Sequence, residues 1–256
     1  MLPKFPNLPS PPFPFQPILN FESCILNFQS PMRQVLNFLS ELRENNTREW
    51  FAEHKEEYLT AQATFNRFAE ELIARMGEID SSVAGLTLRD CTYRIYRDTR
   101  FSPDKSPYKT HFGVIIAPRG KKSGYCGYYF HIEPSGGNYL GGNMLYVGHY
   151  CFERDVLQSI REEIMDYPEA MAAALERAEG FALDRSKMLT RTPKGFPSGT
   201  PQEEWLRLKH WGLTRSIDEE FITAEGLAER VAREFAKTTD FLTIINRAMK
   251  FAFEER

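Results

Sequence analysis

The chain has 256 residues, of which 42% are apolar and 26% charged, and its net charge is −3. These values are typical of a folded globular protein with a large core and exclude a disordered chain. No run approaches the roughly 20 apolar residues that a membrane-spanning helix needs, so we expect no membrane partner. The four cysteines form no CxxC pair, which favours reduced thiols and a cytoplasmic location.

Residues 1–31 are expected to form a disordered, proline-rich tail. Eight of the sixteen prolines lie in this stretch, and proline removes backbone donors and fixes φ. A signal peptide is disfavoured because prolines interrupt every apolar group and Lys4 is the only basic residue. Since a helical pattern begins directly at Met32, we expect Met32 to be the true start and residues 32–256 to form one globular domain.

Helical spacing dominates the chain before residue 86 and after residue 147. Apolar residues at three- and four-residue steps predict one helix over 32–42 and a second, long helix that Thr47 caps and that ends near Gly77. His54 lies on the apolar stripe of the second helix, where we interpret it as packed or hydrogen-bonded. Further helices are expected at 156–164, after Pro168, at 224–236 and at 240–254, with an irregular stretch at 186–201.

Between about residues 86 and 147 the period changes to two, with β-branched and aromatic residues between Gly, Pro and Ser clusters. We place strands at 92–97, 112–117, 125–133 and 138–145. The predicted fold class is therefore α+β, with a central antiparallel sheet over about residues 86–147 that N-terminal and C-terminal helices pack.

A basic segment covers residues 94–122. It holds eight lysines and arginines against two aspartates, an excess of six positive charges. Guanidinium groups bind phosphate or carboxylate through paired hydrogen bonds, and lysine adds a compact charge. We therefore predict a site for a small phosphate- or carboxylate-bearing ligand. Its candidate residues are Arg94, Arg97, Arg100, Lys105 and Lys109, with Lys194 from the loop at 191–197.

Two observations limit this prediction. In a strand over 92–97, alternate side chains would separate Arg94 from Arg97. The arginines and aspartates of the segment could also merely pair with one another, and exposed pairs of this kind stabilise a protein little. A contact surface for nucleic acid or an acidic protein is a third possibility, which the net charge of −3 does not favour.

The stretch 124–134 (GYCGYYFHIEP) supplies candidate catalytic residues. Strand alternation places Tyr125, Tyr129, His131 and Glu133 on one face, and an apolar, core-like set on the other. His131 and Glu133 would then be neighbours that could transfer a proton, although a surface contact without function also accounts for the pattern. With His111 they give an alternative function, an enzyme that acts at a phosphoryl or acyl centre.

Metal and nucleotide sites are not predicted. His149 could complete a ligand set with His131 and Glu133, but nothing in the glycine-rich turn between them compels the three to meet. No P-loop or dinucleotide-binding glycine motif is present, so we expect no cofactor.

Five stretches together resemble the uncharacterised family known as domain of unknown function 2461. They are 46–51 (NTREWF), 94–102 (RIYRDTRFS), 104–111 (DKSPYKTH), 127–134 (GYYFHIEP) and 193–197 (PKGFP). The resemblance runs from about Met32 to the C-terminus and implies a shared architecture without naming a reaction. The proline-rich tail and the stretch 144–151 lie outside it.

Overall fold

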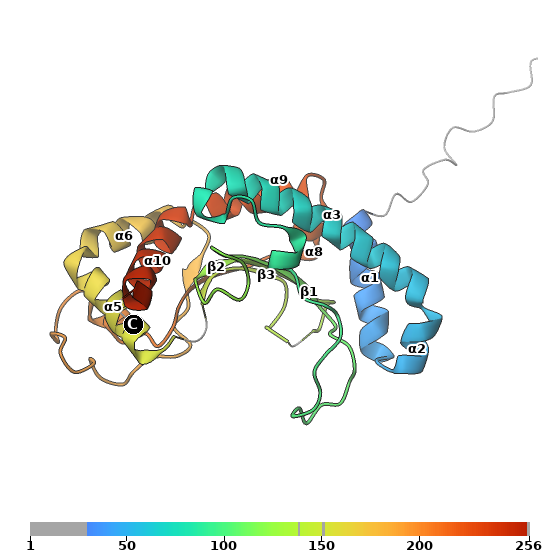
Figure 1. Ribbon diagram of the computed structural model, residues 1–256, viewed down its shortest axis with the longest axis horizontal. Coiled ribbons are helices and arrows are strands. Elements are labelled where there is room, and N and C mark those ends of the chain that lie inside the picture. The colour runs from blue at the N-terminus through green and yellow to red at the C-terminus, as the bar shows by residue number, and fades with distance from the viewer. Residues whose placement is uncertain (1–29, 138, 150–151, 255–256) are drawn as a thin grey trace, which may run out of the picture.

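A computed structural model describes residues 30–137, 139–149 and 152–254 (Figure 1). The proline-rich tail predicted for residues 1–31 lies outside this part of the chain, apart from Ser30 and Pro31. The expected start at Met32 therefore stays a prediction.

Helices come first along the described chain, then strands, then helices again with a late return to the sheet. The helices are α1 (Pro31–Glu44), α2 (Arg48–Glu53), α3 (Lys55–Ile79), the short 3-10 helix η2 (Ser81–Val83), α4 (Leu88–Cys91), α5 (Arg154–Asp166), α6 (Pro168–Arg177), α7 (Glu203–Leu206), α8 (Glu219–Thr223), α9 (Leu227–Ala236) and α10 (Thr239–Glu254). The strands are β1 (Phe112–Ile116), β2 (Gly127–Ile132), β3 (Met144–His149), β4 (Ala182–Leu183) and β5 (Trp211–Ser216).

The strands form one antiparallel sheet in the order β1-β2-β3-β5-β4. The predicted α+β class with an antiparallel sheet is confirmed. The strands predicted at 112–117 and 125–133 correspond to β1 and β2. Most of the predicted helices are also present, as α1, α5, α6, α9 and α10.

The strand predicted over residues 92–97 is wrong. One isolated bridge joins Thr92 to Val114 of β1 and another joins Tyr96 to Tyr108, but the segment forms no strand of its own. Instead, Arg97 N donates to Pro107 O and Lys109 N donates to Ile95 O. The proline-containing loop between them therefore folds back on the segment and occupies backbone groups that a sheet strand would need.

The predicted limits of the sheet also need correction. The strand placed at 138–145 is displaced, since β3 begins only at Met144. Gly141 and Gly142, just before it, have positive φ values that other residues avoid, which makes this stretch a turn. The sheet continues past residue 147 through β5 and β4, because β3 pairs with a segment far along the chain.

One face of the sheet carries the core. Helices α3 and α9 lie side by side over it (Figure 1). Phe68 of α3 packs on Phe130 of β2 with 4.6 Å between ring centroids, and Phe65 packs on Phe112 of β1 at 5.0 Å. Such buried aromatic pairs contribute large apolar areas and fix the helix over the sheet.

The N-terminal helices are broken at His54. Thr47 caps α2 as predicted, since its side chain accepts a hydrogen bond from Trp50 N. The single long helix expected after it is two helices, α2 and α3. Nδ1 of His54 lies 2.8 Å from Trp50 O and its ring stacks on Trp50 at 4.0 Å. The interpretation of His54 as packed or hydrogen-bonded is confirmed, since both contacts are present.

Asn46 joins this helical end to the loop that precedes β1. Its Nδ2 donates to Tyr108 O at 3.0 Å, and its Oδ1 accepts from Tyr108 N at 3.1 Å. The ring of Tyr108 stacks on Phe51 of α2, with 3.9 Å between centroids. The Asn46 side chain therefore takes the place of a strand partner and fixes the basic loop against the helices.

The C-terminal helix packs with α5 and α6 at the opposite end of the molecule (Figure 1). Asn246 of α10 accepts from Cys126 N and donates to Cys126 O, next to the start of β2. Arg161 of α5 is buried and donates to the carbonyl oxygens of Leu206 and Leu208. Both contacts tie the helices to backbone groups that lie just before strands β2 and β5.

Two tyrosines lie over glycines on the other face of the sheet. A Cβ atom on Gly113 would come within 2.5 Å of the Tyr129 hydroxyl, and one on Gly212 within 2.1 Å of the Tyr146 hydroxyl. Each ring thus leans across a neighbouring strand at a position without a side chain. This arrangement leaves the face open and lines it with phenol groups.

Candidate functional site

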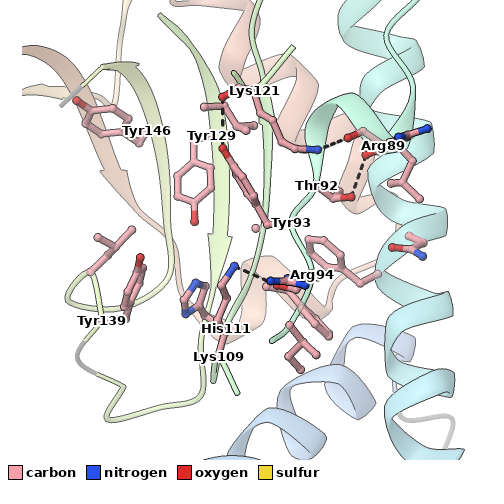
Figure 2. Close-up of a pocket in the computed structure, with 18 of the residues that line it drawn as sticks. Arg89, Thr92, Tyr93, Arg94, Lys109, His111, Lys121, Tyr129, Tyr139 and Tyr146 are labelled. Atoms are coloured by element: carbon pink, nitrogen blue, oxygen red, sulfur yellow. Dashed lines mark hydrogen bonds between the residues drawn. The ribbon is translucent and has the colours of Figure 1, made fainter. Parts of the chain in front are cut away.

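A cavity of about 820 Å³ lies between this open face of the sheet and the segment 88–95 (Figure 2). Ile115, Tyr129 and Tyr146 line it from strands β1 to β3, and α3 adds residues such as Phe65. The volume falls within the range of about 300–1,000 Å³ that is usual for small-molecule sites.

Four cationic side chains line the cavity. They are Arg89, Arg94, Lys109 and Lys121. Among the described residues that form its wall there is no aspartate or glutamate. Asp90 interacts electrostatically with Arg89 and Lys121, and Asp98 with Arg94, but neither aspartate lines the cavity. Four cations on the wall still exceed these two nearby carboxylates, and low-dielectric walls strengthen the resulting positive potential. The cavity is therefore electrostatically suited to an anion.

The two lysines are oriented by backbone carbonyl groups. Lys109 Nζ donates to Arg94 O at 3.0 Å, and Lys121 Nζ donates to Arg89 O (Figure 2). Each ammonium group also lies 5.2 Å from the centre of the Tyr93 ring, close enough for a cation–π contact. Burial, with a smaller effect of Arg94, lowers the pKa of Lys109.

The structure separates the predicted anion-binding residues into two groups. Arg94 and Lys109 line the cavity. Arg97 pairs with Asp104, Arg100 pairs with Asp98, and Lys105 donates to Thr99 O, all within the loop that follows. Lys194 is exposed and is not among the lining residues.

The remaining two cations were not predicted as site residues. Arg89 belongs to α4, ahead of the basic segment, and Lys121 follows β1 in a loop. Lys121 contributed to the count of excess charge, whereas Arg89 gave no signal in the sequence. Both reach the cavity because residue 121 is hydrogen-bonded back to Asp90.

A chain of three residues runs from the cavity to buried positions under the glycine-rich turn. The Tyr129 hydroxyl and Nδ1 of His131 are hydrogen-bonded at 2.9 Å. On the other side of the ring, Nε2 of His131 lies 3.9 Å from Oε2 of Glu133, and it has no hydrogen-bond partner among the described residues. His131 and Glu133 are 0% and 1% exposed. They are neighbours, as strand alternation indicated, but they are buried and make no surface contact.

Glu133 also organises the glycine-rich turn. Its Oε1 accepts from Gly142 N at 2.6 Å and its Oε2 accepts from Tyr139 N at 3.1 Å. Its own backbone N donates to Asn143 Oδ1 at 2.8 Å. Because a buried carboxylate needs such donors, the turn closes around Glu133 and carries Tyr139 to the cavity.

His111 lies between the cavity and the buried pair. Its ring stacks on Tyr139 with 4.0 Å between centroids and lies 5.0 Å from the ring of His131. Burial, with contributions from His131 and Lys109, lowers the pKa of His111 to about 3. Burial also lowers the pKa of His131, against the opposing effect of Glu133. Both imidazoles are therefore neutral at physiological pH.

His149 lines the cavity, as His111 does, while His131 lies behind its surface. Among the described residues, no group of three or more His, Cys, Asp and Glu side chains could hold a metal ion. No helix in that part of the chain is long and apolar enough to cross a membrane.

Comparison with known proteins identifies one family. The model of the family described as Conserved hypothetical protein (DUF2461) matches residues 34–243. The chain belongs to this family. The matched region includes every residue of the cavity. Neither the curated proteins nor the solved structures contain a match to the chain.

Proposed function

We propose that this family member binds a small organic anion, bearing phosphate or carboxylate, in the cavity over the sheet. The observation that supports the proposal is the lining of four cations without a carboxylate among the described residues. Phosphate and carboxylate groups accept paired hydrogen bonds from arginine. The apolar or ring-containing part of such a ligand would lie against the tyrosines, which offer flat, partly apolar surfaces.

Arg94 is the first residue to test. Its side chain lines the cavity and is exposed, so substitution should not disturb the core. A hydrogen bond to a charged group contributes about 1.5–3 kcal/mol, which corresponds to roughly 10- to 150-fold in affinity. Arg94→Ala is therefore expected to weaken ligand binding by at least roughly tenfold.

Arg100→Ala is the matched control. Arg100 belongs to the same basic segment but pairs with Asp98 at 2.6 Å on the exposed loop, outside the cavity. Thermal-shift and calorimetric titrations would use inorganic phosphate, nucleoside monophosphates, sugar phosphates and aromatic carboxylates. A ligand that binds the native protein stabilises it by mass action. Wild type and Arg100→Ala should respond alike, and Arg94→Ala should respond only at higher concentration.

Two results would count against the proposal. If no anion of the panel stabilises the wild type, small-anion binding is rejected. If only oligonucleotides bind, with affinity that falls steeply as salt rises, the cavity rim serves a nucleic-acid contact instead.

We further propose a cytoplasmic location. The support is the state of two cysteines, Cys91 and Cys126, which are free and buried. Stable free thiols are usual in reducing compartments.

A further inference from the structure

We infer that the cavity is also a catalytic site for ester hydrolysis, in which the Tyr129 hydroxyl acts as general base and passes its proton to His131. The inference rests on the proposed function, because the cavity cations would hold the anionic substrate. Its basis is the chain of contacts from Tyr129 through His131 to Glu133.

The position of Tyr129 makes it the reactive end of this chain. Tyr129 lines the cavity, while His131 and Glu133 are buried behind it. Figure 2 shows its ring standing over the cavity with the hydroxyl pointing towards His111, on the side where Lys109 and Arg94 lie. A substrate held by these two cations would thus have the phenol oxygen beside it.

The surroundings of His131 set the direction of proton transfer. Both oxygens of Glu133 accept hydrogen bonds from backbone N–H groups, and its Oε2 also faces Nε2 of the imidazole. The tautomer with its proton on Nε2 places that proton towards Glu133 Oε2, 3.9 Å away. Nδ1 is then the acceptor, and the Tyr129 hydroxyl donates to it.

The proposed reaction moves two protons and exchanges one bond. A water molecule gives a proton to the Tyr129 oxygen as the original hydroxyl proton moves to His131 Nδ1. The water oxygen forms a bond to the phosphorus or acyl carbon of the substrate, and the bond to the leaving alkoxide breaks. The alkoxide then takes a proton from Tyr129, which recovers its own from His131. Water is the only co-reactant, and no group is oxidised or reduced.

Glu133 and the cations stabilise the charges that develop. The imidazolium formed on His131 faces the Glu133 carboxylate, which is the arrangement of an acid, base and orienting residue in hydrolytic triads. Negative charge on the phosphoryl or acyl oxygens would lie among the cationic side chains that line the cavity. In this scheme Tyr129 is the catalytic residue, and His131 and Glu133 are positioning and relay residues.

A purely structural role for the same contacts makes different predictions. In that case Tyr129 would only satisfy a buried imidazole, and the Nδ1 proton could equally be donated to the phenol. The titratable groups that surround His131 are Tyr129 and Glu133 on its own strand and just beyond it, His111 ahead of β1, and Tyr139 on the turn. If His131 relays the proton, the rate of hydrolysis must depend on whether His131 is protonated, and these neighbouring groups influence that protonation.

The main experiment compares hydrolysis by wild type, Tyr129→Phe and Tyr167→Phe. The probes are 4-nitrophenyl phosphate, 4-nitrophenyl acetate and the phosphate esters of the binding panel. General-base catalysis contributes about 10²- to 10⁴-fold, so Tyr129→Phe should lower kcat by that factor with little change in KM or in anion affinity. Tyr167 is exposed at the C-terminal end of α5 and does not line the cavity. Tyr167→Phe should therefore have the kcat and KM of the wild type.

The pH profile tests the relay. Because only neutral His131 can accept the proton, kcat/KM should rise with pH through an acidic limb. Glu133→Gln removes the charge that favours the imidazolium, so this limb should move to lower pH and kcat should fall. An unchanged limb in Glu133→Gln would contradict the role of Glu133.

Several outcomes separate this inference from the binding proposal. A ligand that binds but is never hydrolysed rejects catalysis and leaves binding intact. Hydrolysis of the uncharged acetate ester that depends on Tyr129, without binding of any anion, supports catalysis and rejects the binding proposal. Equal activity of Tyr129→Phe and wild type rejects the catalytic role. If Tyr129→Phe does not fold, the ¹⁵N NMR signals of His131 in the wild type decide, since a proton on Nδ1 overturns the scheme.

Discussion

Glu133 links the buried side chains to the turn above them. Both of its oxygens accept backbone hydrogen bonds, from Gly142 and Tyr139. In Glu133→Gln one acceptor becomes an amide group that faces a backbone N–H, so a buried donor loses its partner. We expect the free energy of unfolding to fall by about 1–3 kcal/mol, measured by urea denaturation.

Glu44→Gln is the control for this change. Glu44 is exposed and pairs only with the adjacent Arg43 among the contacts described for it, and exposed substitutions of this kind usually change stability by less than about 0.5 kcal/mol. Similar losses in both variants would show that Glu133 does not hold the turn.

Gly113 determines where the Tyr129 ring can lie. A Cβ atom at this position would lie 2.5 Å from the Tyr129 hydroxyl and 2.7 Å from a ring carbon, so Gly113→Ala must push the ring aside. Overpacking of this kind costs about 1–3 kcal/mol in stability. In a Tyr129→Ala background the same substitution should have little effect, because the clashing ring is absent. A double-mutant cycle measured by chemical denaturation tests the difference.

Contacts between individual side chains could be predicted from the sequence where residue spacing along one strand decides them. Alternation along 125–133 was sufficient to make His131 and Glu133 neighbours, because a strand fixes the direction of every second side chain. It could not show that both are buried, since burial depends on the turn that folds over them. The distinction between Arg94 in the cavity and Arg97 paired with Asp104 was equally out of reach, because it follows from the course of a loop.

Asn46 matters at the level of elements, since it fixes the basic loop to the helices. Asn46→Ala removes the partner of both backbone groups of Tyr108, so we expect the free energy of unfolding to fall by about 1–3 kcal/mol. The neighbouring Asn45 is exposed and donates only to Glu41 O in the contacts described for it. Asn45→Ala should have a clearly smaller effect in the same thermal or urea denaturation, and equal effects would contradict the role of Asn46.

Helices and strands were predicted correctly where the contacts that define them join residues close together in the sequence. Helices with a continuous apolar stripe, such as α1 and α10, were found with nearly correct limits because i to i+4 contacts define them. The 92–97 segment has the composition of a strand, yet its backbone pairs with the loop at 107–109. β5 was missed because its pairing with β3 joins distant segments, and Gly212 weakens its alternation.

At the scale of the whole molecule, His111 gives stability a dependence on pH. Burial holds its pKa at about 3, whereas a histidine in the unfolded chain titrates near pH 6.5. Below about pH 6.5 the unfolded state therefore binds a proton that the folded state does not accept. The stabilising effect of neutral His111 is fully present above that pH and is lost as the pH falls towards 3.

This sign can be checked by substitution. His111→Asn removes the titrating group, so its free energy of unfolding should fall less steeply than that of the wild type between about pH 6.5 and pH 4. Denaturant titrations at a series of pH values measure both slopes. Parallel slopes would show that His111 is not held neutral by the fold.

Tyrosines line the cavity and tryptophans lie outside it, so ligand binding and unfolding should each change a different optical signal. None of the three tryptophans is a lining residue of the described cavity, whereas Tyr93, Tyr125, Tyr129, Tyr139 and Tyr146 all are. Trp211 is fully buried against Phe241 of α10, so its emission should change on unfolding. Occupancy of the cavity should instead perturb tyrosine absorbance. One sample can therefore report ligand binding and loss of the fold through different chromophores, without a label.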